Sequence, residues 1–198
     1  MYRPVTLLNT TYKLFARLIQ IRMARGLDSK LRSTQFGYRA NRSTSQPLFA
    51  LHRLLELATQ KDTALYLMFL DWEKAFDIIS HGNLHSALVR MGVPPKYVNV
   101  IDAIYSDPRF TVMTNDEESK SHSATAGIRQ GCPLSPYLSL FVHSAIMMDV
   151  DERVERAGGW GGGQVCLRAH SWVIDVGSSQ LRARPFGNGF FTNGLKHP

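Results

Sequence analysis

Apolar side chains recur at helical spacing in the first third of the chain. They predict a helix over residues 11–25, whose apolar face carries Tyr12, Phe15, Ile19 and Met23. A second periodic segment, residues 47–59, predicts another helix with Pro47 near its first turn, where the missing N–H does no harm, and Ser45 as a plausible cap.

The middle of the chain alternates between strand and helix signals. A short, continuous apolar run at residues 64–70 is typical of a buried strand. Helices are predicted near residues 83–91 and 95–106, followed by a hairpin over 109–114 and 119–125. A loop at 127–136 then leads into a last apolar helix near 137–148. This order of elements predicts an α+β fold.

Glycine marks the clearest boundary. Residues 156–198 contain 9 of the 15 glycines, and such a density costs too much backbone entropy for regular structure. We therefore expect one domain over residues 1–155, followed by a disordered glycine-rich tail over residues 156–198.

Composition excludes several classes of protein. With 198 residues and 44% hydrophobic side chains, the chain can build the core of one domain. No uncharged apolar run is long enough to span a bilayer, and the first residues lack the apolar region of a signal peptide. Two cysteines cannot form a disulfide framework. We expect a soluble, intracellular protein with free thiols and no membrane association.

Charge is distributed unevenly around a formal net charge of +7. Residues 1–70 carry a net +8, residues 71–155 a net −5, and residues 156–198 a net +4. A basic block beside an acidic one suits a protein that binds a polyanion with one part and divalent cations with another. Two solvated faces of opposite sign explain the same numbers, so charge alone does not decide the function.

Asp71 stands where the predicted strand ends, within Leu70-Asp71-Trp72-Glu73-Lys74-Ala75-Phe76-Asp77. A carboxylate at the end of a buried strand is held rigidly and faces a crevice, as a catalytic metal ligand requires. Mg²⁺ prefers one or two protein carboxylates together with phosphate oxygens of the substrate. Alternatively, Asp71 caps the segment that follows, because aspartate is a favoured N-cap residue.

Two loops carry further candidate chemistry. In the loop from Gly127 to Pro136, GIRQGCPLSP, two glycines permit close approach of a ligand, and Arg129 and Gln130 could donate to phosphate, sugar or base. In the segment 35–44, QFGYRANRST, aromatic residues alternate with arginines, which suits phosphate binding. An ordinary loop before a helix and a solvated basic loop are the alternative interpretations.

Taken together with Arg3-Pro4-Val5-Thr6-Leu7-Leu8-Asn9 and Tyr12-Lys13, these segments resemble the successive motifs of reverse transcriptases. The match is to the non-long-terminal-repeat retrotransposon type, with group II intron enzymes as nearest cousins, and it covers residues 2–150. We expect the glycine-rich tail over residues 156–198 to be unrelated to the family. Each motif alone is weak, but four of them in this order and spacing are specific.

The resemblance implies RNA-templated DNA synthesis on a right-hand fold, of which this chain would supply the fingers and part of the palm. The implied partners are an RNA template, a DNA primer and deoxynucleoside triphosphates, with Mg²⁺ as cofactor. Asp71 would be the catalytic residue and metal ligand, whereas the Asp77 side chain would be structural. Nuclear action follows from the family, although the sequence has no dense Lys/Arg cluster as a localisation signal.

Residue by residue, the resemblance also implies a substrate pocket. Phe76 would pack under the incoming sugar and exclude a 2′-hydroxyl group. Gln130 and Gly131 would line the pocket for the nucleotide and the template. Arg39 and Arg42 would belong to the fingers and reach the triphosphate.

The sequence departs from the family in one respect that matters for chemistry. The family holds its two metal ions with further carboxylates in a Tyr/Phe-x-Asp-Asp hairpin, and this chain contains no adjacent Asp-Asp pair. The nearest substitute, Asp149-Val150-Asp151, follows an apolar helix and is typical of a charged helix end. We therefore expect the chain to be inactive or nearly so, and the strand at 64–70 to lack a cover.

Two other hypotheses remain open from the sequence. The chain could be a non-catalytic remnant whose basic block binds nucleic acid through phosphate contacts. It could also lack a stable fold, because a palm without its hairpin buries little apolar surface.

Overall fold

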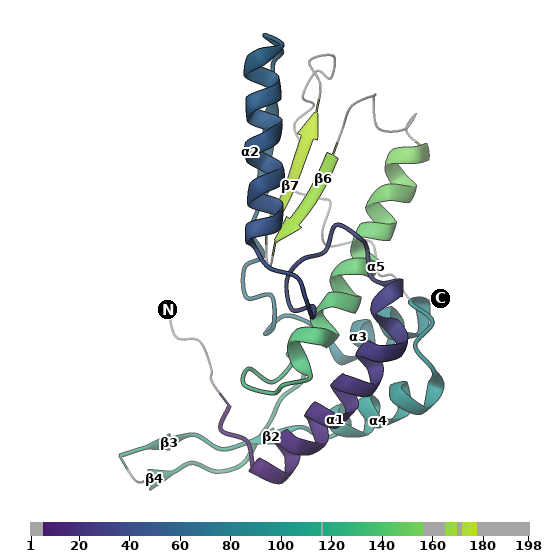
Figure 1. The fold of residues 1–198 in the computed structure, drawn as a ribbon. Helices are drawn as coiled ribbons and strands as arrows, with labels where there is room; N and C mark the ends of the chain where they lie inside the picture. The colour runs from purple at the N-terminus through teal and green to yellow at the C-terminus, as the bar shows by residue number, and fades with distance from the viewer. Residues whose placement is uncertain (1–5, 116, 157–164, 170–171, 178–198) are drawn as a thin grey trace.

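The computed structural model describes residues 6–115, 117–156, 165–169 and 172–177 (Figure 1). Within these residues the elements are, in chain order, α1 (Thr10–Leu27), the short 3-10 helix η1 (Asp28–Lys30), α2 (Ser45–Gln60), β1 (Tyr66–Leu70), α3 (His81–Arg90), α4 (Pro95–Tyr105), β2 (Arg109–Phe110), β3 (Met113–Thr114), β4 (Glu117–Glu118), β5 (His122–Ser123), α5 (Ser135–Arg156), β6 (Val165–Ala169) and β7 (Trp172–Gly177). The predicted α+β class is confirmed.

The main core is helical, and α5 lies at its centre. Residues 137–142 of α5 are all buried, with Leu138 and Phe141 fully so. A helix that is buried around its whole circumference needs neighbours on every side. These include α1, which contributes Ala16 and Met23, and α3 and α4, whose buried faces complete the cluster. The helices packed around α5 therefore form the rigid core that positions the loops.

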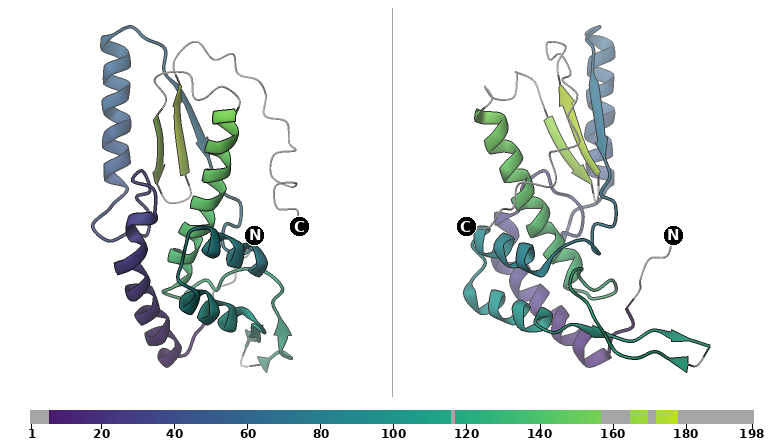
Figure 2. Two further views of the ribbon diagram at one scale, coloured as in Figure 1. Left: turned by 90° about the vertical axis from the view of Figure 1, so that its right-hand side faces the viewer. Right: turned by 180° about the vertical axis from the view of Figure 1, so that it is seen from behind.

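A three-stranded antiparallel sheet, in the order β1-β7-β6, forms the second layer. The views of Figure 2 place this sheet between α2 and α5. A smaller apolar cluster accompanies it, formed by partly buried side chains of α2, β1 and the adjoining loops: Phe36, Ala50, Leu51, Leu54, Leu65 and Leu67. No helix in the described part of the chain is long and apolar enough to cross a membrane.

The predicted helices are confirmed, with shifts of one or two residues at most of their ends. The largest difference concerns α5, which runs to Arg156 rather than ending near Met148. Ion pairs support this charged extension: Asp149 pairs with Arg90, and Asp151 pairs with Arg32. The interpretation of the Asp149–Asp151 segment as a charged helix end is thus confirmed.

The predicted hairpin is also present, and it projects from the body of the molecule (Figure 1). It consists of two short antiparallel pairs, β2 with β5 and β3 with β4, rather than one continuous ladder. Asn115 adopts a positive φ of 49° next to its tip, a conformation that asparagine tolerates better than most residues.

The expectation of a disordered tail is wrong for two segments after residue 156. Strands β6 and β7 pair with each other, and β7 pairs with β1 over all five residues of that strand. Both segments are rich in β-branched and other apolar residues, which favour strand pairing. The strand at 64–70 therefore has a paired neighbour in the sheet, whereas Phe69 on it is 52% exposed. Residues 157–164, with most of the glycine run, and 178–198 lie outside the described residues.

Candidate active site

Asp71 is the first residue after β1, and its side chain is exposed. The register of the sheet places Val173, the second residue of β7, opposite Leu70. The start of β7 therefore lies beside the end of β1 that leads into Asp71. The following loop is anchored by Trp72, whose ring lies 5.2 Å from the ring of His143 on α5.

The segment after Asp71 is joined by backbone hydrogen bonds to the glycine-containing loop that precedes α5. The Ile128 N–H donates to the Phe76 carbonyl oxygen, and the Gly127 N–H donates to the Ile79 carbonyl oxygen, each at 2.8 Å. An isolated bridge between Ser80 and Ala126 extends the pairing. Two motifs that lie about fifty residues apart in the sequence thus form one site.

Gln130 is held at both its side chain and its backbone. Its Nε2 donates to Oδ1 of Asp77 at 2.8 Å. Its carbonyl oxygen accepts from the Thr6 N–H at 2.9 Å, which brings the segment before α1 across the loop. The structural role that the resemblance implied for Asp77 agrees with this contact, because the carboxylate fixes the orientation of the glutamine amide.

Both glycines of the loop adopt backbone conformations that favour glycine over other residues. Gly127 has a φ of +93° and Gly131 a φ of +104°, values that side-chain-bearing residues rarely adopt. A Cβ at Gly131 would lie 2.9 Å from the carbonyl oxygen of Thr6. The backbone at Gly131 is thus in close contact with the segment before α1, and its own surface is exposed.

Arg129 packs between two tyrosines instead of projecting as a free donor. Its guanidinium carbon lies 5.1 Å from the ring centroid of Tyr12 and 5.8 Å from that of Tyr105. It also donates to the Ile104 carbonyl oxygen at 3.4 Å. Burial and a hydrogen bond with the Cys132 thiol raise the pKa of Tyr12, although the positive charge of Arg129 acts against this shift. The sequence predicts Arg129 as a hydrogen-bond donor for a ligand, but it does not predict that this side chain packs between two tyrosines beneath the loop.

Phe76 is half-buried and packs against the main core. Its ring meets the ring of Tyr38 edge to face, with the centroids 6.3 Å apart. This contact brings the segment 35–44 to the same site as the segment after β1. Tyr38 is 43% exposed and has a φ of 56°, so it forms part of the surface next to Phe76.

The two arginines of the segment 35–44 differ in their surroundings. Arg39 is buried: its guanidinium donates to both carboxylate oxygens of Asp28, at 3.0 and 2.7 Å, and to backbone carbonyl oxygens, including that of Gln35. Arg39 is therefore occupied within the fold, and this geometry does not support its predicted contact with a triphosphate. Arg42 is partly exposed, donates to the Ser33 carbonyl oxygen and stacks over Phe36 at 5.4 Å.

The described residues do not fit the two Mg²⁺ ions that the resemblance implies. Asp71 supplies one exposed carboxylate, and no cluster of three or more His, Cys, Asp or Glu side chains in the described ranges could hold a metal ion. Asp149 and Asp151, in the C-terminal part of α5, pair with Arg90 of α3 and with Arg32, respectively. In the register of the sheet, Asp175, the one acidic residue of β7, lies opposite Met68, which is three positions before Asp71.

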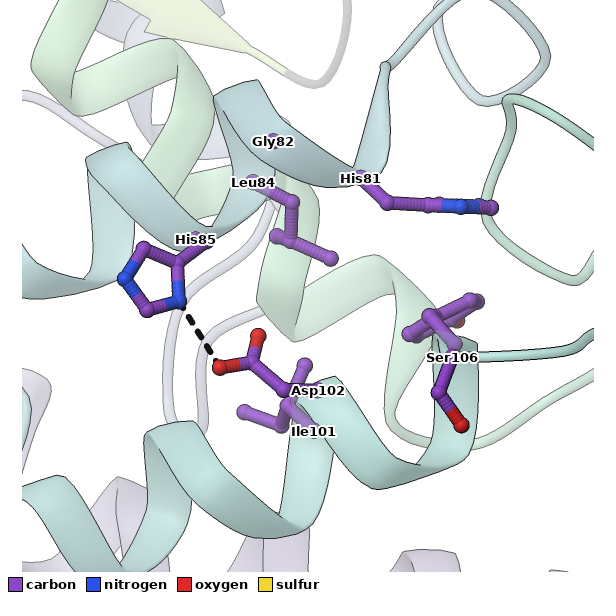
Figure 3. Close-up of a pocket in the computed structure, with 8 residues that line it drawn as sticks. His81, Gly82, Leu84, His85, Ile101, Asp102 and Ser106 are labelled. Carbon is purple, nitrogen blue, oxygen red and sulfur yellow. Dashed lines mark hydrogen bonds and ion pairs between the residues drawn. The ribbon is translucent and has the colours of Figure 1, made fainter.

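A separate hollow of about 320 Å³ lies between α3 and α4 (Figure 3). His85 and Asp102 face each other there, with Nδ1 and Oδ2 2.7 Å apart, whereas His81 points away toward the Gly127 loop. None of the site residues predicted from the sequence lines this hollow.

Comparison with known proteins gives a consistent family. The model of the family "Reverse transcriptase (RNA-dependent DNA polymerase)" matches residues 1–168. The chain is 32% identical over 155 residues to a probable RNA-directed DNA polymerase from transposon X-element of Drosophila melanogaster, covering 75% of this chain and 17% of that protein. It is 31% identical over 137 residues to an uncharacterized 149 kDa protein of transposon TX1 from Xenopus laevis, covering 69% of this chain and 10% of that protein. The chain thus spans less than a fifth of either relative.

Solved structures agree on the fold. The apo telomerase of Candida tropicalis, truncated of its C-terminal domain, superimposes with a TM-score of 0.58 at 16% identity, over 88% of this chain and 39% of that one. At this identity the likeness shows the fold alone. The family match, which includes β6 nearly to its end, also extends beyond the resemblance found over residues 2–150. The chain therefore belongs to the reverse transcriptase family, with relatives among the RNA-directed DNA polymerases of non-long-terminal-repeat retrotransposons.

Proposed function

We propose that this chain forms the fingers and part of the palm of a right-hand reverse transcriptase, with the RNA template and the incoming deoxynucleotide bound at the junction of β1 and the Gly127–Gly131 loop. The observation that carries the proposal is the direct connection of the two motifs. The Asp77–Gln130 hydrogen bond and two backbone hydrogen bonds hold the segment after Asp71 against the loop.

Side chains at this junction fit the substrate roles. Phe76 and Tyr38 form an aromatic edge beside the loop, which suits packing against a sugar and exclusion of a 2′-hydroxyl group. Gln130 and Gly131 would contact the nucleotide and the template in this proposal, since the amide is fixed by Asp77 and the exposed glycine leaves its backbone accessible. Arg42 is the better candidate for triphosphate contact, because Arg39 is already bound to Asp28.

Catalysis by this chain alone is absent or nearly so in our proposal. Phosphoryl transfer depends on stabilising the charge that develops at the attacking and leaving oxygens, and losing that stabilisation costs several kcal/mol. Among the described residues, Asp71 belongs to no group of three or more His, Cys, Asp or Glu side chains that could hold a metal ion. The chain would therefore keep the substrate surface of its family while lacking the charge arrangement for the reaction. Action in the nucleus, with a DNA primer and deoxynucleotides, stays a prediction from the family.

Primer extension on an RNA template tests this proposal. The full chain and its Asp71→Asn variant are compared with Mg²⁺ and with Mn²⁺, and a thermal melt and an RNA-binding isotherm establish that both proteins are folded and bind RNA. We expect no extension above background from either protein. Extension by the wild-type chain that disappears in Asp71→Asn would contradict the inactivity and would identify Asp71 as catalytic.

A further inference from the structure

All the charged side chains that helix α1 presents to solvent are basic. Its charged residues are Lys13, Arg17, Arg22 and Arg25, and it contains no acidic residue. All four side chains are exposed, and none of them pairs with a carboxylate in the described part of the chain; Arg17 donates to the neighbouring Gln20. Four uncompensated cations on one helix form a strong local positive field.

The opposite face of α1 is fixed in the main core. Ala16, Ile19, Met23 and Leu27 are buried there, so the helix cannot rotate its basic face away from solvent. From Lys13 to Arg25 the helix rises about 18 Å at 1.5 Å per residue. That length equals about five nucleotides of a helical strand at 3.4 Å each.

Large apolar side chains lie between these cations. Leu14 is 63% exposed and Leu18 is 55% exposed, each one helical turn or less from a basic residue. Surfaces that bind single-stranded nucleic acid combine cations for the phosphates with apolar or aromatic groups for the bases and sugars. A helix that inserts into a membrane surface would instead need a broad apolar face free of the protein, and four of the apolar residues of α1, Ala16, Ile19, Met23 and Leu27, are buried in the core.

The basic face begins at the candidate active site. The Thr6 N–H donates to Gln130, and Tyr12 in the first turn of α1 contacts both Cys132 and Arg129. Lys13 follows Tyr12 directly in the first turns of α1, so the row of cations starts at the end of the helix that contacts the loop.

We propose that the exposed face of α1, made by Lys13, Leu14, Arg17, Leu18, Arg22 and Arg25, binds an RNA strand along its phosphate backbone and guides it to the Gln130–Gly131 loop. This inference rests on the proposed function for the direction of the strand. Its binding chemistry does not depend on metal ions or on catalysis, because the contacts are cation-to-phosphate contacts.

The test uses two variants of the full chain that carry the same net charge. Lys13→Gln, Arg22→Gln and Arg25→Gln remove three cations from α1, whereas Lys61→Gln, Lys96→Gln and Lys120→Gln remove three exposed cations from other elements, so both triple variants change the formal charge from +7 to +4. Affinity for a single-stranded RNA oligonucleotide of mixed sequence is measured without divalent ions at several salt concentrations. Thermal melts confirm that each variant is folded. If the triple α1 variant is not folded, the double variant Arg22→Gln, Arg25→Gln replaces it.

The slope of log K against log salt distinguishes the outcomes. Each lost phosphate contact on a single strand reduces the slope by about 0.7, so we expect a reduction of about 2 for the α1 variant and none for the control. Equal slopes for the two variants would overturn the α1 surface while leaving the proposed function intact. Binding of both variants to vesicles of anionic phospholipid is measured in parallel. If the α1 variant loses vesicle binding while its RNA binding is unchanged, the RNA-binding role of α1 is overturned in favour of a membrane surface. If the wild-type chain binds no RNA, the surface and the template role both fail.

Discussion

Replacing Gly127 with alanine perturbs the contact on which the proposed site depends. The backbone there has a φ of +93°, and an added Cβ would lie 3.1 Å from the Asp77 carbonyl oxygen and 3.3 Å from the Asp77 Cα. Both neighbours are backbone atoms, so the clash cannot be relieved by a side-chain rotation. The segment after Asp71 and the loop must separate.

The expected loss of stability follows from the structure. A left-handed conformation costs a residue with a side chain about 1–2 kcal/mol. Separation also weakens the Gly127–Ile79 and Ile128–Phe76 hydrogen bonds, each with a net contribution of about 1 kcal/mol. We expect Gly127→Ala to lower the free energy of unfolding by about 2–4 kcal/mol, which corresponds to about 4–16 °C in Tm for a domain of this size.

Gly26 provides the matched control, because it lies in the last turn of α1 with no atom within 4 Å of an added Cβ. Gly26→Ala should leave stability unchanged or raise it by about 0.5–1 kcal/mol. Denaturant unfolding followed by circular dichroism measures both variants. If Gly127→Ala unfolds within about 0.5 kcal/mol of the wild type, the loop is not held against Asp77 as described.

Further predictions concern buried polar groups. Arg39→Met leaves the Asp28 carboxylate and backbone carbonyls without their donor and should cost about 3 kcal/mol in denaturant unfolding. Arg42→Met should cost less than about 1 kcal/mol, and equal losses would refute the distinction between the two arginines. Burial raises the pKa of the Tyr137 hydroxyl, so this group loses its proton at a lower pH in the unfolded chain than in the folded one. The free energy of unfolding should therefore fall above pH 10, by up to about 1.4 kcal/mol per pH unit. Tyr137→Phe should flatten this decline without loss of stability at pH 7, because the buried hydroxyl has no partner among the described atoms; an unchanged slope would exclude Tyr137 as its source.

The elements predicted correctly were those with a strong local pattern. The period of apolar residues in α1 and the continuous apolar run of β1 follow from short-range sequence alone. Strands β6 and β7 were missed because the surrounding glycines dominated the composition. The pairing of β7 with β1 joins residues about a hundred positions apart, and no local pattern encodes such a contact.

The candidate site was predicted in part for the same reason. Motif order indicated that Asp71 and Gln130 belong together, and the structure supplies the connection through Asp77. The roles of the arginines depend on partners far along the chain, such as Tyr12 and Tyr105 on either side of Arg129. A basic residue in a loop is compatible with ligand binding and with internal pairing, so only the three-dimensional contacts separate these roles.

The most direct test of the proposed lack of a complete metal centre is Mn²⁺ binding, followed by electron paramagnetic resonance on the wild-type chain and on Asp71→Asn. A lone exposed carboxylate holds a divalent ion weakly, because tight sites require several oxygen ligands. We predict no saturable Mn²⁺ binding below about 1 mM for either protein. Saturable binding of Mn²⁺ by the wild-type chain in that range, lost in Asp71→Asn, would contradict the account and show that further ligands complete the site.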